Sequence, residues 1–101
     1  MTNFINLTPH AIVLNNGSCF EPNGSVARVS ATFVEKEEYF FKQEFGEVIN
    51  LPEPKENTYY IVSALVFAAT DRKDVVAPAT GHPACVRENG FIKSVPGFVA
   101  H

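Results

Sequence analysis

Residues 26–34 read Val-Ala-Arg-Val-Ser-Ala-Thr-Phe-Val and carry the clearest periodicity of the chain. Apolar and polar side chains alternate here, as they do in a strand that buries one face in a core. The apolar set is Ala27, Val29, Ala31 and Phe33, and the polar set is Arg28, Ser30 and Thr32. We therefore predict a strand with one buried face and one polar strip headed by an arginine.

The segments before this strand predict further β structure. Residues 4–7 are apolar and are followed by Thr8-Pro9, where proline removes a backbone donor, so a first strand is expected to end there. Asn15-Asn16-Gly17-Ser18 tolerates positive φ and separates two strand candidates, residues 11–14 and 19–21. This pattern predicts a hairpin.

The segment after residue 34 is expected to turn and return. Glu35-Lys36-Glu37-Glu38 reads as an exposed turn, and residues 39–45 as an aromatic strand. Residues 46–50 are predicted to extend that strand past a bulge. Residues 51–57 include two prolines and three charged residues. The prolines cannot donate backbone hydrogen bonds to a neighbouring strand, and the charged residues leave the segment without an apolar face. This segment is predicted to form the longest loop.

A strand, a short helix and another strand are predicted next. Residues 58–62 have the composition of a buried strand, and Ser63 is placed to cap a helix over residues 64–69. One long strand through this region is the alternative. The Ala-Leu-Ala content after a plausible cap favours the helix. Residues 75–76 then form a short strand that ends at Pro78.

The last part of the chain has the strongest hairpin signal. Within residues 84–94, Asn89-Gly90 lies between two short segments in which apolar and polar residues alternate. Pro96-Gly97 is expected to end the regular structure, leaving His101 loose. The fold class predicted is α+β: one domain over residues 1–101, mainly antiparallel β with about five to seven strands and one short helix.

Composition limits the classes of function. The chain has 101 residues, 46% hydrophobic and 12% aromatic, so it is expected to fold as one domain. The net charge of −3 argues against duplex nucleic acid as the main partner. No apolar run is long enough to span a membrane and no signal-peptide pattern opens the chain, so a cytoplasmic protein is expected. Cys19 and Cys85 are expected to be free thiols there.

No catalytic or metal-binding pattern is present in the sequence. Thr8-Pro9-His10 is interpreted as a structural corner between two strands, with the His10 ring bonded to a backbone group, although a ligand-binding role for that ring is the alternative. His82 reads as a loop residue. Cys85 with a histidine could be drawn as a nucleophile and base, but no local motif supports it. We predict no enzyme activity, no metal and no cofactor.

The arginines are the best candidates for binding an anion. Seven of the eleven acidic residues lie between Glu35 and Glu56, whereas Arg28, Arg72 and Arg87 all lie outside that stretch. A guanidinium makes paired hydrogen bonds to phosphate, and Phe67 could offer a face on which a base stacks. The alternative is that each arginine is an ordinary surface charge and that Phe67 belongs to the core.

Five blocks of the sequence, taken together, resemble a family of small tailed-phage and prophage proteins. They are Asn-Leu-Thr-Pro-His-Ala-Ile at residues 6–12, residues 22–30, Leu-Pro-Glu-Pro at 51–54, Tyr-Ile-Val-Ser-Ala-Leu-Val at 60–66, and Arg-Lys-Asp-Val at 72–75. Within this family the chain looks like the Thoeris anti-defence sponge group. Members of that group are small oligomers that trap a cyclic ADP-ribose-type immune signal without degrading it, using arginines and an aromatic residue.

The resemblance implies a non-enzymatic phage protein that sequesters a nucleotide-derived signal in the cytoplasm of an infected bacterium. It carries over first to Arg28, which lies inside the matching block of residues 22–30, and then to Arg72 and Arg87. A domain of this size has little room for a deep pocket, so a homo-oligomer with shared sites is expected. The rival hypothesis is a protein-protein inhibitor of a host factor, or a small virion-associated module, that binds through residues 39–45. A hydrolase is the third.

Overall fold

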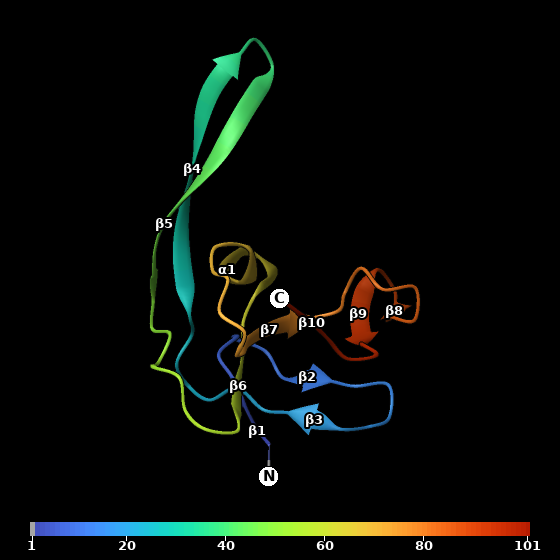
Figure 1. Cartoon of the computed structure of the whole chain (residues 1–101). Helices are drawn as coiled ribbons and strands as arrows, with labels where there is room; N and C mark the ends of the chain where they lie inside the picture. The colour runs from blue at the N-terminus through green and yellow to red at the C-terminus, as the bar shows by residue number, and fades with distance from the viewer. Residues whose placement is uncertain (1) are drawn as a thin grey trace.

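The computed structural model describes residues 2–101, and its elements surround one four-stranded sheet (Figure 1). In chain order the elements are β1 (Asn3–Asn6), β2 (Ile12–Val13), β3 (Cys19–Phe20), β4 (Arg28–Glu37), β5 (Phe40–Ile49), β6 (Thr58–Ile61), α1 (Ala64–Ala68), β7 (Val75–Pro78), β8 (Val86–Glu88), β9 (Phe91–Ser94) and β10 (Phe98–Ala100). The prediction of a β-rich chain with one short helix is confirmed. Ten strands form instead of five to seven, because several short strands of two to four residues pair around the sheet.

The central sheet is mixed, with the strand order β1-β6-β7-β10. β1 pairs with β6 and β6 with β7 in parallel, whereas β10 pairs with β7 antiparallel. The helix α1 provides the crossover that two adjacent parallel strands require. Antiparallel pairing, which the sequence predicted for most of the β structure, describes the edge strand β10 and the three hairpins β2–β3, β4–β5 and β8–β9.

Strand β6 separates two clusters of buried side chains. Tyr60 and the following Val62 belong to the first cluster, with Leu7, Ala27, Val66 and Val75. Ile61 points the other way and joins Ile12, Val76 and Val95 in the second cluster. Because successive side chains of a strand alternate between its faces, one short buried strand supports two hydrophobic layers. The sheet therefore has α1 over one face and the β2–β3 and β8–β9 hairpins over the other.

The helix α1 begins where the sequence predicts. Ser63 has extended backbone angles, and its side chain accepts a hydrogen bond from the Val66 amide at 3.3 Å, which satisfies one free donor of the first turn. Val66 is the buried residue of this helix. The alternative of one long strand through residues 58–69 is therefore wrong.

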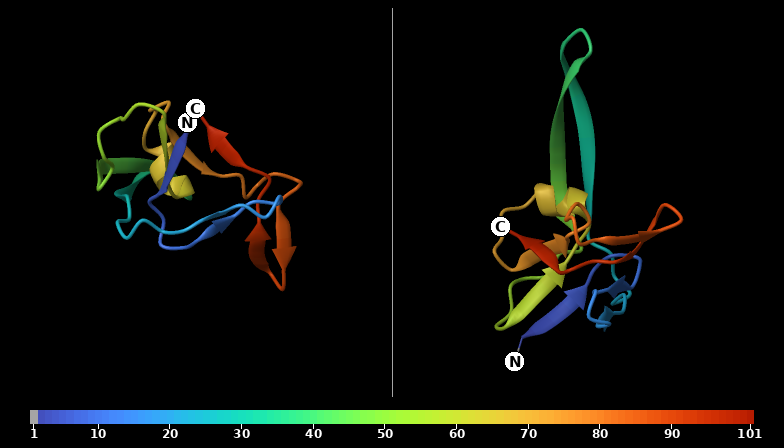
Figure 2. Two further views of the ribbon diagram at one scale, coloured as in Figure 1. Left: turned by 90° about the horizontal axis from the view of Figure 1, so that it is seen from below. Right: turned by 90° about the vertical axis from the view of Figure 1, so that its right-hand side faces the viewer.

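The hairpin of β4 and β5, which we call the arm (residues 28–49), projects from the body of the protein (Figures 1 and 2). The apolar face predicted for this strand is buried only near the base of the arm. Ala27, just before β4, is buried and Val29 is half-buried, but Phe33 is 68% exposed. The alternation correctly predicts a strand, but no second layer covers its outer half. The turn lies at Glu38 and Tyr39 instead of residues 35–38, so β4 continues to Glu37.

The C-terminal end is also more ordered than the sequence predicts. Regular structure resumes after Gly97 as β10, which pairs with β7. His101 stacks on Phe67, with ring centroids 4.0 Å apart and planes 6° apart, and its Nε2 lies 3.0 Å from the Phe67 carbonyl oxygen. The expectation of a loose His101 is therefore wrong, because a ring far away in the sequence provides a docking face.

Candidate functional site

The turn signal at residues 6–10 forms a corner that is built around one buried amide side chain. Asn6 is 2% exposed, and its Nδ2 donates to the carbonyl oxygens of His10 at 2.8 Å and Phe20 at 2.9 Å. Its Oδ1 accepts from the Thr8 amide at 2.9 Å and from Thr8 Oγ1 at 2.6 Å. The prediction of a structural corner is confirmed. The His10 backbone carbonyl, instead of its ring, is the group that holds this turn, and the ring is left exposed.

This corner forms one wall of the largest depression described, which we call the corner groove. Its volume is about 640 Å³. Residues 8–13 form one wall, residues 91–95 of β9 and its continuation form the other, and Ser63, Ala64, Pro78 and Thr80 complete the lining. A volume of this size lies within the ~300–1,000 Å³ range of sites that bind small ligands. The β8–β9 hairpin and the corner therefore form a depression of the size that small ligands occupy.

The corner groove is mainly apolar and has a weakly basic character. Among its lining residues, all within the described part of the chain, there is no carboxylate, and the ionisable side chains are those of His10 and Lys93. Lys93 is held by an exposed ion pair with Glu88 at 3.3 Å. Phe91, at the start of β9, is 78% exposed. The groove can take an apolar or aromatic group that also carries negative charge.

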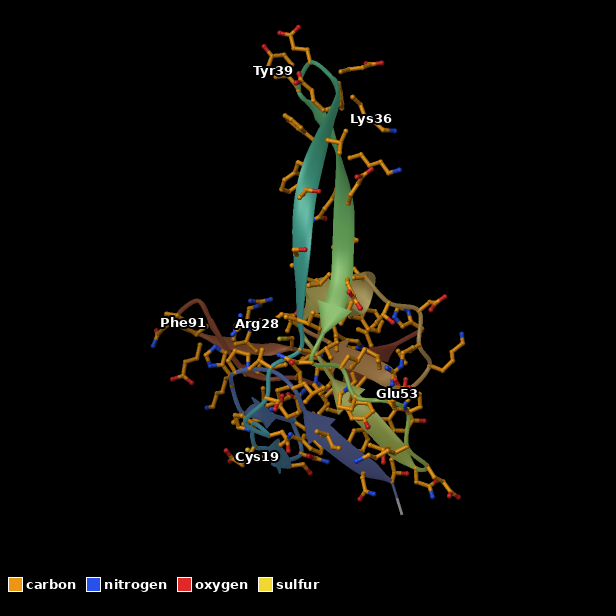
Figure 3. All side chains as sticks on the ribbon, turned by 90° about the vertical axis from the view of Figure 1, so that its left-hand side faces the viewer. Cys19, Arg28, Lys36, Tyr39, Glu53 and Phe91 are labelled. Atoms are coloured by element: carbon orange, nitrogen blue, oxygen red, sulfur yellow. The ribbon has the colours of Figure 1, made fainter. Side chains whose placement is uncertain are left out.

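Arg87 is the one predicted arginine that lies beside this groove. Its Nη2 donates to the carbonyl oxygen of Thr80 at 3.0 Å, and Thr80 is part of the groove lining. Arg28 lies instead at the base of the arm (Figure 3) and does not line the groove. The sequence therefore identifies a basic residue near the groove, although it gives no sign that the groove exists.

Arg72 is engaged by its own chain. Its Nε and Nη2 donate to Asp74 at 2.9 and 2.6 Å, and its Nη1 donates to the Pro52 carbonyl oxygen at 3.0 Å. The guanidinium carbon also lies 5.9 Å from the centre of the Tyr60 ring. The hydrogen bond to Asp74 raises the pKa of Arg72 above its ordinary value. In this arrangement Arg72 ties the loop of residues 50–57 to the end of the helix connector.

The predicted ligand residues do not converge on one site. Arg28 belongs to β4, Arg72 to the connector before β7, and Arg87 to β8. Phe67 packs against the first core cluster, and its ring is stacked on His101. The four depressions described within residues 2–101 contain one of the three arginines, Arg72, in a shallow site that also has Glu53 and Asp74. Two carboxylates beside that guanidinium oppose the entry of an anion.

The arm carries a second candidate surface, which the sequence reveals only in part. Cross-strand partners share a face, and the pairs Ala31 with Phe45, Phe33 with Gln43 and Glu35 with Phe41 are in register. Phe33, Phe41 and Phe45 therefore line one side, which we call the aromatic strip. The rings of Phe33 and Phe41 meet edge to face at 6.5 Å. Residues 39–45 were predicted to be an aromatic strand, but β4 was expected to bury its share of this surface.

The described residues contain no metal-binding cluster, no disulfide and no membrane-spanning helix. Within residues 2–101 no three histidine, cysteine, aspartate or glutamate side chains are grouped closely enough to hold a metal ion. Cys19 and Cys85 are free thiols in this structure. The described helix α1, with five residues, is far too short to cross a membrane.

Comparison of the chain with protein-family models, with curated proteins and with solved structures finds no match. The resemblance to phage proteins therefore depends on the quoted sequence blocks alone.

Proposed function

We propose that this chain is a non-enzymatic interaction protein that binds a protein surface through the arm. The observation that carries this proposal is the exposure of the aromatic residues of the arm. Phe33, Tyr39, Phe40 and Phe41 are 68, 84, 66 and 60% exposed. Tyr39 lies with Lys36 at the far end of the arm, away from the body (Figure 3). Such a group of exposed rings is typical of a surface that a partner covers.

The total surface of the chain supports the same proposal. A folded monomer of this mass exposes about 5,700 Å², whereas the described chain exposes 6945 Å². The radius of gyration is 15.0 Å, against about 13 Å for a compact domain of this length. The surplus area of roughly 1,300 Å² exceeds the ~800 Å² that one partner buries in a standard protein interface. The arm is large enough to supply a whole binding surface.

The backbone at the end of the arm gives a further reason. Tyr39 has φ of 73°, in the left-handed region that strongly disfavours a bulky side chain. The β8–β9 hairpin places Asn89 and Gly90 at its positive-φ positions, which is the usual choice. An aromatic residue at the corresponding strained position of the arm is best explained by a contact that its ring makes elsewhere.

Site-specific photo-crosslinking tests this proposal. A photoreactive phenylalanine at position 40 or 41 is expected to form adducts with a protein partner in cells that produce the chain, and mass spectrometry of the adduct identifies the partner peptide. The matched control places the same group at Val99, an exposed residue of β10. Adducts no more abundant at positions 40 and 41 than at position 99 would show that the arm has no partner.

We propose as a second candidate the sequestration of a cyclic ADP-ribose-type signal, as a phage anti-defence protein in the host cytoplasm. What supports it is the location of Arg87 beside the apolar corner groove, because a nucleotide needs both an apolar face for its base and donors for its phosphates. Neither Arg28 nor Arg72 lines the groove, so Arg87 and Lys93 would have to provide those donors.

A release experiment tests this second candidate. The protein is incubated with cyclic ADP-ribose isomers, separated from free ligand and then denatured by heat. Recovery of the intact nucleotide supports sequestration, and an altered nucleotide indicates an enzyme. Arg87→Ala is expected to weaken uptake more than Arg28→Ala. Absence of uptake by the unaltered protein would reject the candidate.

A further inference from the structure

The end of the arm has an exposed aromatic and acidic surface of the kind that another protein surface can bind. Tyr39 and Phe40 present two exposed rings there, and three glutamates, Glu35, Glu37 and Glu38, surround them with one lysine, Lys36. An isolated two-stranded ribbon is only marginally stable in water. The end of the arm therefore combines apolar area, negative charge and a need for support from another surface.

The corner groove has the complementary properties. It is open, its lining is mainly apolar, and the exposed ring of Phe91 stands at its edge. Its volume of about 640 Å³ admits two aromatic side chains. Lys93 and His10 line it and Arg87 lies beside it, whereas none of the lining residues is acidic; Glu88, outside the lining, is paired with Lys93 at 3.3 Å across an exposed contact that an incoming carboxylate can share. The distribution of charge thus favours an aromatic segment that is flanked by carboxylates.

The arm cannot fill the groove of its own chain. No residue of the arm lines the groove. Figure 1 shows the arm rising along one side of the body while β8 and β9 lie at the other, and the view from below in Figure 2 agrees. Ten residues in each strand give the arm a reach of about 33 Å, and this reach is directed away from the body. Only an arm from another molecule can enter the groove.

We infer that the end of the arm of one molecule, centred on Tyr39 and Phe40, docks in the corner groove of a second copy of this chain. This inference rests on the proposed function, because it names the partner of the arm. Each copy has one arm and one groove, so two copies can exchange arms in a closed dimer or pass them around a ring. The surplus surface of the whole chain, roughly 1,300 Å², exceeds the ~800 Å² that each copy buries in a standard interface.

Two variants separate the arm from the groove. Phe40→Ser removes an aromatic ring from the arm and leaves the groove intact, whereas Ile92→Asp places a carboxylate in the groove and leaves the arm intact. Val86→Asp is the matched control for the groove, because Val86 and Ile92 lie in the same hairpin and are 43 and 45% exposed, but Val86 does not line the groove. Val99→Ser is the control for the arm.

Sedimentation analysis over a concentration series measures the association of each form. The unaltered protein and both controls are expected to associate, and Phe40→Ser and Ile92→Asp are each expected to weaken association at least about tenfold. The decisive sample is an equal mixture of these two variants. It is expected to form a mixed dimer that neither variant forms alone, because the intact arm of one fits the intact groove of the other.

Association that is unchanged in either variant, or a mixture that stays as monomeric as its components, would overturn the inference. So would an unaltered protein that remains monomeric over the whole concentration series. Circular dichroism of each variant excludes loss of the fold as the cause. The crosslinking experiment keeps this result apart from the proposed function, since an adduct from position 40 to a different protein would leave the arm as a binding surface with another partner.

Discussion

The ring of His101 lies flat on the ring of Phe67, with centroids 4.0 Å apart, and the same histidine reaches the Phe67 carbonyl oxygen through Nε2. This contact connects the residue after β10 to the helix α1, two elements more than thirty residues apart in the chain. It positions Phe67 as part of the body of the protein, with one face of its ring covered.

Removal of this contact is expected to have a modest cost. His101→Ala should lower the free energy of unfolding by about 0.5–1 kcal/mol, the usual contribution of a stacked aromatic pair at a partly exposed site. Urea denaturation measures the change, with Val99→Ala as the control on the neighbouring strand. An effect no larger than that of the control would mean that the stack adds nothing to stability.

Loss of the Asn6 side chain is expected to be far more damaging. Asn6→Ala removes four hydrogen bonds at a buried position and should lower the free energy of unfolding by about 3 kcal/mol. Asn23→Ala at an exposed position provides the control, because a surface substitution usually changes stability by less than about 0.5 kcal/mol. Thermal and urea denaturation should agree on the ranking. Equal stability of the two variants would contradict the role of Asn6 as the centre of the corner.

Tyr39→Gly is expected to change stability and association in opposite directions. Glycine accepts the φ of 73° without strain, so the arm of the monomer should gain about 0.5–1 kcal/mol. Hydrogen exchange of amides in residues 30–46, measured at low concentration, should slow two- to fivefold. Association should weaken, since the ring is lost. Faster exchange in the variant would show that Tyr39 stabilises its own turn.

The Cys19 thiol is expected to be less reactive than an ordinary exposed thiol near pH 8. Its hydrogen bond to Glu21 at 3.4 Å raises its pKa, and slight burial and the negative charge of Glu21 act in the same direction. Because the folded chain holds this proton more tightly, the associated stability is present below the ordinary thiol pKa and is lost as the pH rises through the higher folded value.

The pH dependence of alkylation measures this effect. In a Cys85→Ser background, the midpoint of the iodoacetamide rate should lie above that of an unstructured cysteine peptide, and Glu21→Gln should bring it back towards the peptide value. A midpoint that Glu21→Gln leaves in place would show that Glu21 has no influence on the thiol.

The sequence predicts local structure well where one short segment contains the whole signal. Asn89 and Gly90 specify their hairpin, Ser63 specifies the start of α1, and the prolines of residues 51–57 specify a loop. It fails where the outcome depends on distant parts of the chain. Phe33 alternates like a core residue, but nothing in its own segment shows that no layer covers it. The docking of His101 on Phe67 is hidden for the same reason.

The candidate sites show the same division. Residue type alone marked the aromatic strand 39–45 as a candidate interface, and it drew attention to Arg87. The corner groove needs residues 8–13 and 91–95 to meet. This contact depends on the bridge between Leu14 and Val95, which are too far apart in the chain for a local pattern to specify. The engagement of Arg72 by Asp74 is a short-range contact, yet its third bond reaches Pro52 across the fold.

The two long sides of the arm have a consequence for the behaviour of the protein in solution. β4 and β5 pair with each other and, within residues 2–101, with no other strand, so their outer backbone groups are open along ten residues each. Open strand edges beside aromatic side chains favour fibrous aggregation. The arm places five glutamates and two lysines, Lys36 and Lys42, along these edges. The repulsion between these glutamates opposes the approach of a second open edge, so the arm carries its own protection against stacking edge to edge with other copies.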